Sequence, residues 1–230
     1  MSVAGLVLAA GAGRRYGMPK ALVAYQGRLL VQRAADTLRE AGCDRVLIVL
    51  GAAAERVRAL VLPDTGVGPD WAVPDTVVNP DWAVPDTGVN PDWALPDTVV
   101  NPDWATGMGS SLRIGLTTLA GTDAIAAVVL LVDMPGVTAE AVRRIIAHAT
   151  EDALVMGGYG DRRGHPVLLG RDHWDGVAAS ATGDRGARDY LRTHEVLVVP
   201  VGDVADDEDL DEPGNFPSNL PSNLSVPNDH

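Results

Sequence analysis

The sequence lacks the features of secreted and membrane proteins. Cys43 is its only cysteine, so an intramolecular disulfide is excluded and a zinc site built on cysteines is not expected. No uninterrupted apolar run is long enough to cross a bilayer, and no basic segment precedes the first apolar run at Val3. We therefore expect a cytoplasmic protein with neither a membrane span nor a secretory signal.

Basic residues are also scarce. Lys and Arg number 18 against 31 Asp and Glu, which gives a formal charge of −13 at pH 7. Because binding to nucleic-acid backbones requires clustered cations, we do not expect a nucleic-acid partner. A few local cations can still bind a small anionic ligand, since near charges outweigh distant, screened ones. The 46% of hydrophobic residues is typical of a globular chain.

An eleven-residue segment occurs four times in tandem, beginning at Pro63, Pro74, Pro85 and Pro96. Two prolines in each copy exclude a continuous helix. In one interpretation the copies present Trp71, Trp82 and Trp93 to a protein partner. In the other, a surface loop has been lengthened by duplication and only the last copy, 96–106, is native to the fold. We favour the second, because long loop insertions cost little entropy.

The rest of the chain alternates strands and helices. Strands are expected at 3–8, 45–50, 99–100, 126–132, 153–156, 166–169 and 196–200, and helices at 29–40, 53–62, 110–120, 138–149 and 186–193. This order predicts an α/β, Rossmann-like fold, in which a doubly wound, mainly parallel sheet has helices on both faces. We expect one domain over 1–213, interrupted by the repeats at 63–95, and a flexible tail at 214–230.

The first strand runs into a glycine-rich loop, GAGRRYGMPK, at residues 11–20. Glycines let backbone N–H groups approach an anion, and Arg15 and Lys20 supply positive charge, so the loop suits a polyphosphate. The alternative is a glycine-rich turn with solvated cations. The spacing fits neither a dinucleotide-binding fingerprint nor a Walker loop, because Pro19 interrupts it and no Gly-Lys-Ser/Thr follows.

A carboxylate follows the most apolar of the expected strands. Asp133 comes directly after residues 126–132 and precedes Met134 and Pro135. Mg²⁺ prefers one or two carboxylates together with phosphate oxygens, so Asp133 is a candidate metal ligand. Ordering of the following turn is the alternative role.

The LAAG-x-G-x-R-x-G-x-P-K and LVDMP segments together resemble the MobA-like nucleotidyltransferases, and most closely their molybdenum cofactor cytidylyltransferase branch. The resemblance implies a nucleotide-diphospho-sugar-transferase-like fold and a metal at Asp133. It also implies use of CTP rather than GTP, because the loop begins with LAAG in place of LAGG. The loop departs from the family at Tyr16, where the family usually has Met. The implied contacts to base and sugar are Leu8, Ala9, Ala10 and Gly11, and those to phosphates are Gly13, Arg15 and Lys20.

Two further segments resemble parts of this family. Residues 101–116 resemble the segment after its third strand, which implies base recognition by Asn101, Ser110 and Ser111; both serines are also predicted to cap a helix start. Residues 203–210, DVADDEDL, resemble a D-x-D-T-P-E-D-L ending. Asp203 fits its first acid and Ala205 replaces the second, so a second metal contact and a solvated acidic surface remain open.

On the substrate side, the Gly-His-Pro turn at His165 and the segment GDRGAR, with Asp184 and Arg188, also resemble family motifs. Arg188 either meets an anionic substrate or pairs with Asp184. We do not assign His165 as a catalytic base.

The resemblance implies Mg²⁺-dependent transfer of a nucleotidyl group, with CMP from CTP favoured, to a phosphorylated acceptor such as molybdopterin. Arg15, Lys20 and Asp133 would be the catalytic residues. Two alternatives remain. Nicotine blue oxidoreductases, which use NAD(P)H, are similar to the same branch, although the sequence has no separate nicotinamide fingerprint. A non-catalytic binding protein could use the tryptophan repeats.

Overall fold

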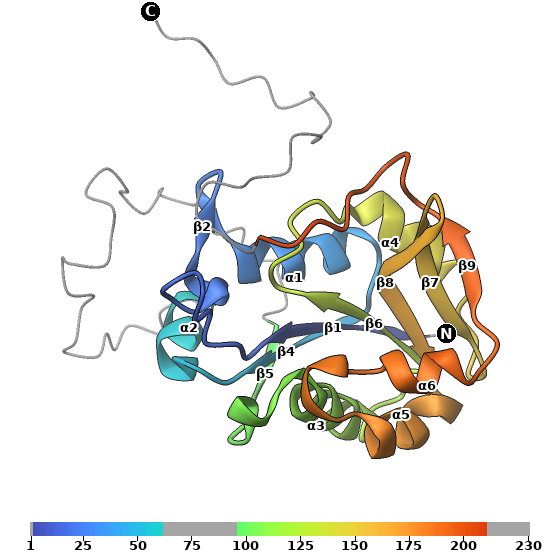
Figure 1. The fold of residues 1–230 in the computed structure, drawn as a ribbon, viewed down its shortest axis with the longest axis horizontal. Helices are drawn as coiled ribbons and strands as arrows, with labels where there is room; N and C mark the ends of the chain where they lie inside the picture. The colour runs from blue at the N-terminus through green and yellow to red at the C-terminus, as the bar shows by residue number, and fades with distance from the viewer. Residues whose placement is uncertain (1, 62–95, 211–230) are drawn as a thin grey trace, which may run out of the picture.

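The computed structural model describes residues 2–61 and 96–210 (Figure 1). The expected repeat insertion at 63–95 and the expected tail at 214–230 lie outside these residues. Within them, no helix is long and apolar enough to cross a membrane.

A seven-stranded sheet forms the centre of the molecule, in the order β5-β4-β1-β6-β8-β7-β9. Its first strand, β1, is an apolar run that is buried along its whole length, as expected for a strand covered on both faces. The strands are β1 (Val3–Ala9), β4 (Arg45–Leu50), β5 (Asp97–Val100), β6 (Ala126–Leu131), β7 (Leu154–Tyr159), β8 (Arg162–Gly170) and β9 (Leu197–Pro200).

Most neighbouring strands are parallel, which confirms the predicted fold class. β1 pairs in parallel with both β4 and β6, and β4 with β5 and β7 with β9 are parallel as well. β8 is antiparallel to both of its neighbours, β6 and β7. The reason is local: only residues 160 and 161 separate β7 from β8, and so short a connection produces a hairpin.

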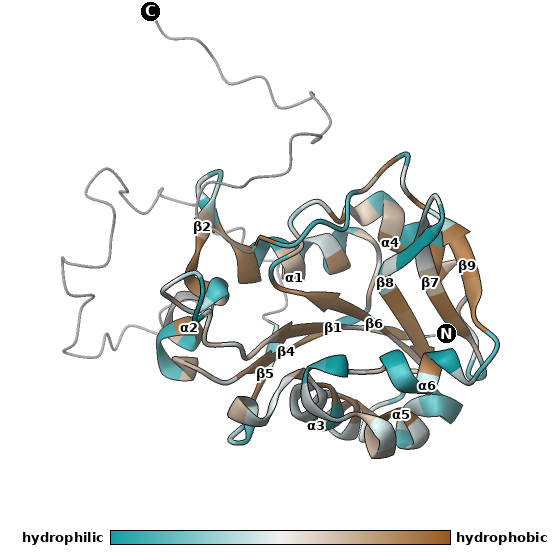
Figure 2. Cartoon of the chain, in the orientation of Figure 1, coloured by the Kyte–Doolittle hydropathy of each residue, from teal (hydrophilic) through white to brown (hydrophobic). Residues whose placement is uncertain are grey.

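Helices cover both faces of the sheet (Figure 1). On one face lie α1 (Leu30–Glu40), α2 (Ala54–Val61) and α4 (Ala139–Ile146), and on the other α3 (Met108–Ala120), α5 (Trp174–Ser180) and α6 (Arg188–Arg192). Each face has its own hydrophobic cluster, and the strands between them are the most apolar part of the fold (Figure 2). The expected doubly wound arrangement is therefore present.

Every strand and helix expected within the described residues is present, with small differences in its ends. Among the α-helices and strands, α5 and a short hairpin of β2 (Ala24–Tyr25) and β3 (Arg28–Leu29) were not expected. α5 is held by tertiary contacts: the Trp174 side chain is buried, and its indole N–H donates to the Leu169 carbonyl at 2.9 Å. The sequence of α5 is short, contains a glycine and shows no clear helical periodicity.

The strand order fixes the place of the ligand site. β1 lies between β4 and β6, so the chain leaves β1 toward one side of the sheet and returns later on the other. In parallel sheets, ligands bind at the carboxyl ends of the strands where the order reverses in this way. The glycine-rich loop follows β1 and Asp133 follows β6, and both are thus delivered to one crevice.

Candidate active site

The glycine-rich loop is a compact turn that requires glycine at Gly13. This residue has φ of +59°, and a Cβ added to it would lie 1.8 Å from the Met18 carbonyl oxygen. The Gly17 N–H closes the turn by donating to the Gly13 carbonyl at 2.9 Å. The chain then enters a single 3₁₀ turn, η1 (Lys20–Leu22), rather than an α-helix. Any anion bound here is held by the loop itself and not by a helix N-terminus.

The two motifs that the sequence separates by 113 positions meet in this crevice. Lys20 Nζ donates to Asp133 Oδ2 at 2.7 Å. Both side chains are largely shielded from solvent, with exposed fractions of 15% for Lys20 and 21% for Asp133. Lys20 and Asp133, both predicted as catalytic residues, are therefore in direct contact. Arg15 lies exposed on the same loop.

The Asp133 turn is anchored on two sides. The Val132 N–H donates to the Leu8 carbonyl at 3.2 Å, and the Leu210 N–H donates to the Asp133 carbonyl at 2.9 Å. Its carboxylate is thereby held beside the loop. Among residues 2–61 and 96–210, no three His, Cys, Asp or Glu side chains form a metal-binding cluster. Asp133 can thus offer a cation one carboxylate, and Mg²⁺ typically takes one or two carboxylates together with phosphate oxygens.

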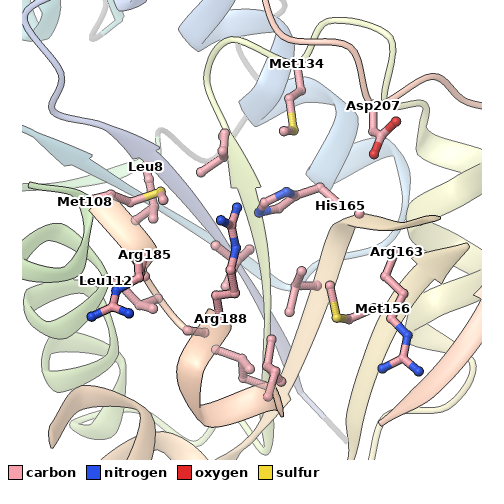
Figure 3. Close-up of a pocket in the computed structure, with 18 of the residues that line it drawn as sticks. Leu8, Met108, Leu112, Met134, Met156, Arg163, His165, Arg185, Arg188 and Asp207 are labelled. Atoms are coloured by element: carbon pink, nitrogen blue, oxygen red, sulfur yellow. The ribbon is translucent and has the colours of Figure 1, made fainter. Parts of the chain in front are cut away.

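The residues assigned to base and sugar reach the crevice mainly through their backbone. Leu8, Ala9 and Ala10 are buried in or at the end of β1, and Gly11 is exposed where the loop begins. The Ala10 carbonyl already accepts the Ala52 N–H at 3.0 Å. The Leu8 side chain lines a neighbouring cavity (Figure 3).

Asn101, Ser110 and Ser111 come together, but the predicted capping is wrong. The buried Asn101 side-chain amide donates to Ser110 Oγ at 2.8 Å and to Ser111 Oγ at 3.0 Å. Helix α3 begins two residues before Ser110, at Met108, after Gly107 as N-cap with no capping side chain on that residue. The two hydroxyls therefore fasten the end of β5 to α3 instead of capping backbone N–H groups.

A cavity of about 610 Å³ adjoins this crevice on the α3 and α6 side of the sheet (Figure 3). Its walls combine an apolar floor with several arginines. The floor includes Leu8, Leu112, Val129, Leu131, Val167 and Leu169, and the arginines are Arg162, Arg163, Arg185, Arg188 and Arg192. Such a mixture suits a ligand with an apolar body and an anionic group.

Arg188 and His165 face one another in the cavity (Figure 3). The Asp184 carboxylate, the other predicted partner of Arg188, instead accepts the Met108 N–H on its Oδ1 at 3.3 Å. No ion pair of Arg188 occurs within the part of the chain that the structure describes. The guanidinium is exposed into the cavity.

His165 is neutral at physiological pH. Burial lowers the pKa of its imidazole to about 4, and the positive charge of Arg188 acts in the same direction, whereas Asp133 and Asp207 oppose it. The Tyr159 hydroxyl donates to the His165 carbonyl at 2.6 Å and fixes this turn. His165 can therefore contribute a hydrogen bond in the cavity but no charge.

In the acidic segment 203–210, Asp203 and Asp207 lie in different surroundings. Arg144 engages both carboxylate oxygens of Asp203, at 2.7 and 2.9 Å, on an exposed surface. Asp207 lines the cavity instead, with 8% of its side chain exposed and a 3.0 Å ion pair to Arg162. Gly164 permits this approach, since a Cβ there would lie 2.1 Å from Asp207 Oδ2. The sequence alone does not distinguish Asp207 from the neighbouring acidic residues of this segment.

Comparisons with known proteins agree with this geometry. Residues 5–198 match the model of the MobA-like NTP transferase domain. The chain is 34% identical over 222 residues to nicotine blue oxidoreductase of Paenarthrobacter nicotinovorans, which covers 91% of this chain and 92% of that protein. A shorter match, 43% over 60 residues, covers 26% of this chain and 30% of a probable molybdenum cofactor guanylyltransferase of Bacillus cytotoxicus.

Among solved structures, Rv0371c of Mycobacterium tuberculosis has a TM-score of 0.66 and 30% identity, covering 91% of this chain and 93% of that one. A second structure of Rv0371c, in complex with manganese, has a TM-score of 0.62 and 28% identity, covering 87% of this chain and 89% of that one. The match of the family model to residues 5–198 gives one conclusion: the chain belongs to the MobA-like NTP transferase family.

Proposed function

We propose that the protein transfers a nucleotidyl group, CMP from CTP, to a phosphorylated acceptor such as molybdopterin and releases pyrophosphate. The observation that carries this proposal is the 2.7 Å contact between Lys20 and Asp133. It unites a glycine-rich anion-binding loop with a carboxylate suited to Mg²⁺ at the carboxyl edge of a parallel sheet.

The reaction needs no covalent enzyme intermediate. An acceptor phosphate oxygen attacks the α-phosphorus of the nucleotide, the bond from that phosphorus to the bridging oxygen breaks, and pyrophosphate leaves with the electron pair. The chain positions the two reactants and offsets charge as it develops. Lys20 and Arg15 would bind the departing phosphates. Asp133 would hold Mg²⁺, which supplies further neutralisation of the phosphate charge.

The cavity beside the crevice supports the choice of acceptor. Its apolar floor suits a ring system, and the Arg188 guanidinium suits a phosphate, for which arginine offers paired donors. Neutral His165 lies next to that guanidinium and can hydrogen-bond the same ligand. A molybdopterin-like acceptor has both parts.

Pyrophosphate release tests the proposal. The full chain is incubated with Mg²⁺, molybdopterin and each of the four ribonucleoside triphosphates in turn. We expect release with CTP, since the loop reads LAAG, and much less with GTP. The same assay with manganese tests the metal separately. Absence of release with every nucleotide would refute transferase activity toward this acceptor.

A reductase is the second candidate, because the relative that matches 91% of this chain is named nicotine blue oxidoreductase. Such an enzyme would bind NAD(P)H through the same glycine-rich loop and a flat dye in the cavity. Loss of NAD(P)H absorbance that depends on a dye and occurs without pyrophosphate would favour this function.

A further inference from the structure

Lys20 holds the carboxylate that the proposed function assigns to the metal. It is the only lysine of the chain, beside 17 arginines. We propose that Lys20 competes with the divalent cation for Asp133, so that the cation enters the site only together with the nucleotide. The inference rests on the proposed nucleotide site and adds an order of binding to it.

The geometry leaves little room for the two cations at once. The ammonium lies 2.7 Å from Asp133 Oδ2, in a setting where only 15% of the Lys20 side chain is exposed. A divalent cation on the same oxygen would lie at about 2.1 Å from it. Two positive charges so close together repel strongly, and weak access of water leaves that repulsion poorly screened.

Asp133 also has little help in holding a cation by itself. Within the described residues, no set of three or more His, Cys, Asp or Glu side chains forms a metal-binding cluster. Asp203, the second predicted ligand, is engaged by Arg144 through both oxygens. A cation that binds without a nucleotide would therefore break the ion pair between Lys20 and Asp133 and gain only one protein carboxylate as a ligand.

A nucleotide changes this balance. Its phosphates bring oxygen ligands for the cation and, at the same time, new acceptors for the Lys20 ammonium. Lys20 sits at the end of the glycine-rich loop, so a short movement of its side chain transfers it from Asp133 to a phosphate bound there. The carboxylate is then released to the cation.

The side-chain type fits an exchange of partners. Lysine is a compact point charge on a flexible stem, whereas arginine forms fork-shaped, two-point contacts. Arg144 binds Asp203 through two hydrogen bonds, at 2.7 and 2.9 Å, on an exposed surface, whereas Lys20 donates to Asp133 Oδ2 at 2.7 Å in the crevice.

Manganese binding to the full chain without nucleotide tests the inference, with free Mn²⁺ measured by electron paramagnetic resonance. We expect weak binding by the wild type and binding about tenfold tighter or more by Lys20→Met, because a neighbouring opposite charge alters the free energy of a carboxylate by this order. Arg14→Met is the matched control, since it removes one exposed positive charge from the same loop. It should match the wild type, and Asp133→Asn should abolish tight binding in the Lys20→Met background. Equal affinities of wild type and Lys20→Met would overturn the inference.

A measurement on the unaltered chain gives a second test. With ¹⁵N-lysine, the protein has a single side-chain Nζ signal, that of Lys20. We expect CTP to shift this signal strongly and Mg²⁺ alone to leave it in place. A shift of the signal by Mg²⁺ alone, as large as that caused by CTP, would contradict the exchange. Neither experiment contains an acceptor, so failure of nucleotidyl transfer and failure of this inference are separate results.

Discussion

The two sides of the candidate active site, which we propose to bind the nucleotide (the nucleotide side) and the acceptor (the acceptor side), are built in different ways. The nucleotide side consists of one continuous segment, from Leu8 to Lys20, and a single residue from another strand, Asp133. The acceptor side takes its residues from β8, α3, α6 and the segment 203–210, which are distant in the sequence. A site made of backbone is encoded locally, whereas a site made of converging side chains depends on the whole fold.

The two sides also differ in charge. On the nucleotide side, Lys20 is already paired with Asp133. On the acceptor side, Arg188 faces the cavity, and no ion pair for it is seen within 2–61 and 96–210. If the comparison is correct, substitutions on the first side impair the chemical step with every acceptor, while those on the second side alter the use of the acceptor alone.

Asp133→Asn is expected to have the largest effect. The substitution keeps the size of the side chain and removes the charge that would hold the cation, so turnover should fall by a factor of about a hundred or more. Pyrophosphate release measures the loss, and circular dichroism checks that the fold is intact. Asp172→Asn, at an exposed position away from both sides, is the control. Turnover close to that of the wild type would show that the metal does not depend on Asp133.

Arg188→Gln should act on the acceptor side alone. Loss of a charge-assisted hydrogen bond to a phosphate costs about 1.5–3 kcal/mol, so the KM for the acceptor should rise by about tenfold to a hundredfold. The KM for CTP should stay close to that of the wild type. Arg144→Gln, which breaks an exposed ion pair outside the cavity, is the matched control. An equal rise in both KM values would contradict the separation of the two sides.

The same contrast explains what could be predicted from the sequence. The strands of the central sheet, the fold class and the meeting of Lys20 with Asp133 followed from apolar runs and from motifs at strand ends. The antiparallel direction of β8 and the position of Asp207 did not, since both depend on contacts made after folding. The capping prediction for Ser110 failed because α3 begins earlier, where Asp184, 76 residues away, accepts the Met108 N–H.

Gly13→Ala tests the backbone character of the nucleotide side. Alanine at φ of +59° costs about 1–2 kcal/mol, and its Cβ would clash with the Met18 carbonyl, so the loop must change shape. We expect nucleotide affinity to fall by about tenfold, as measured by calorimetry, together with a lower melting temperature. Gly11→Ala is the comparison, since a Cβ there meets nothing within 4 Å and should leave the melting temperature unchanged. Equal melting temperatures for the two variants would show that the turn tolerates a side chain at Gly13.

The last expected effect concerns stability away from neutral pH and involves His165. Its pKa is about 4 in the folded protein against 6.5 for the unperturbed group, so the unfolded chain binds more protons between these values. Its contribution to stability is complete above pH 6.5 and is lost as the pH falls toward 4. Between pH 7 and pH 4, the melting temperature of His165→Gln should therefore fall less than that of the wild type, by about 6–12 °C. His148→Gln, at an exposed position, should follow the wild-type profile. Parallel profiles for the wild type and His165→Gln would mean that the imidazole on the acceptor side is not held in its neutral form.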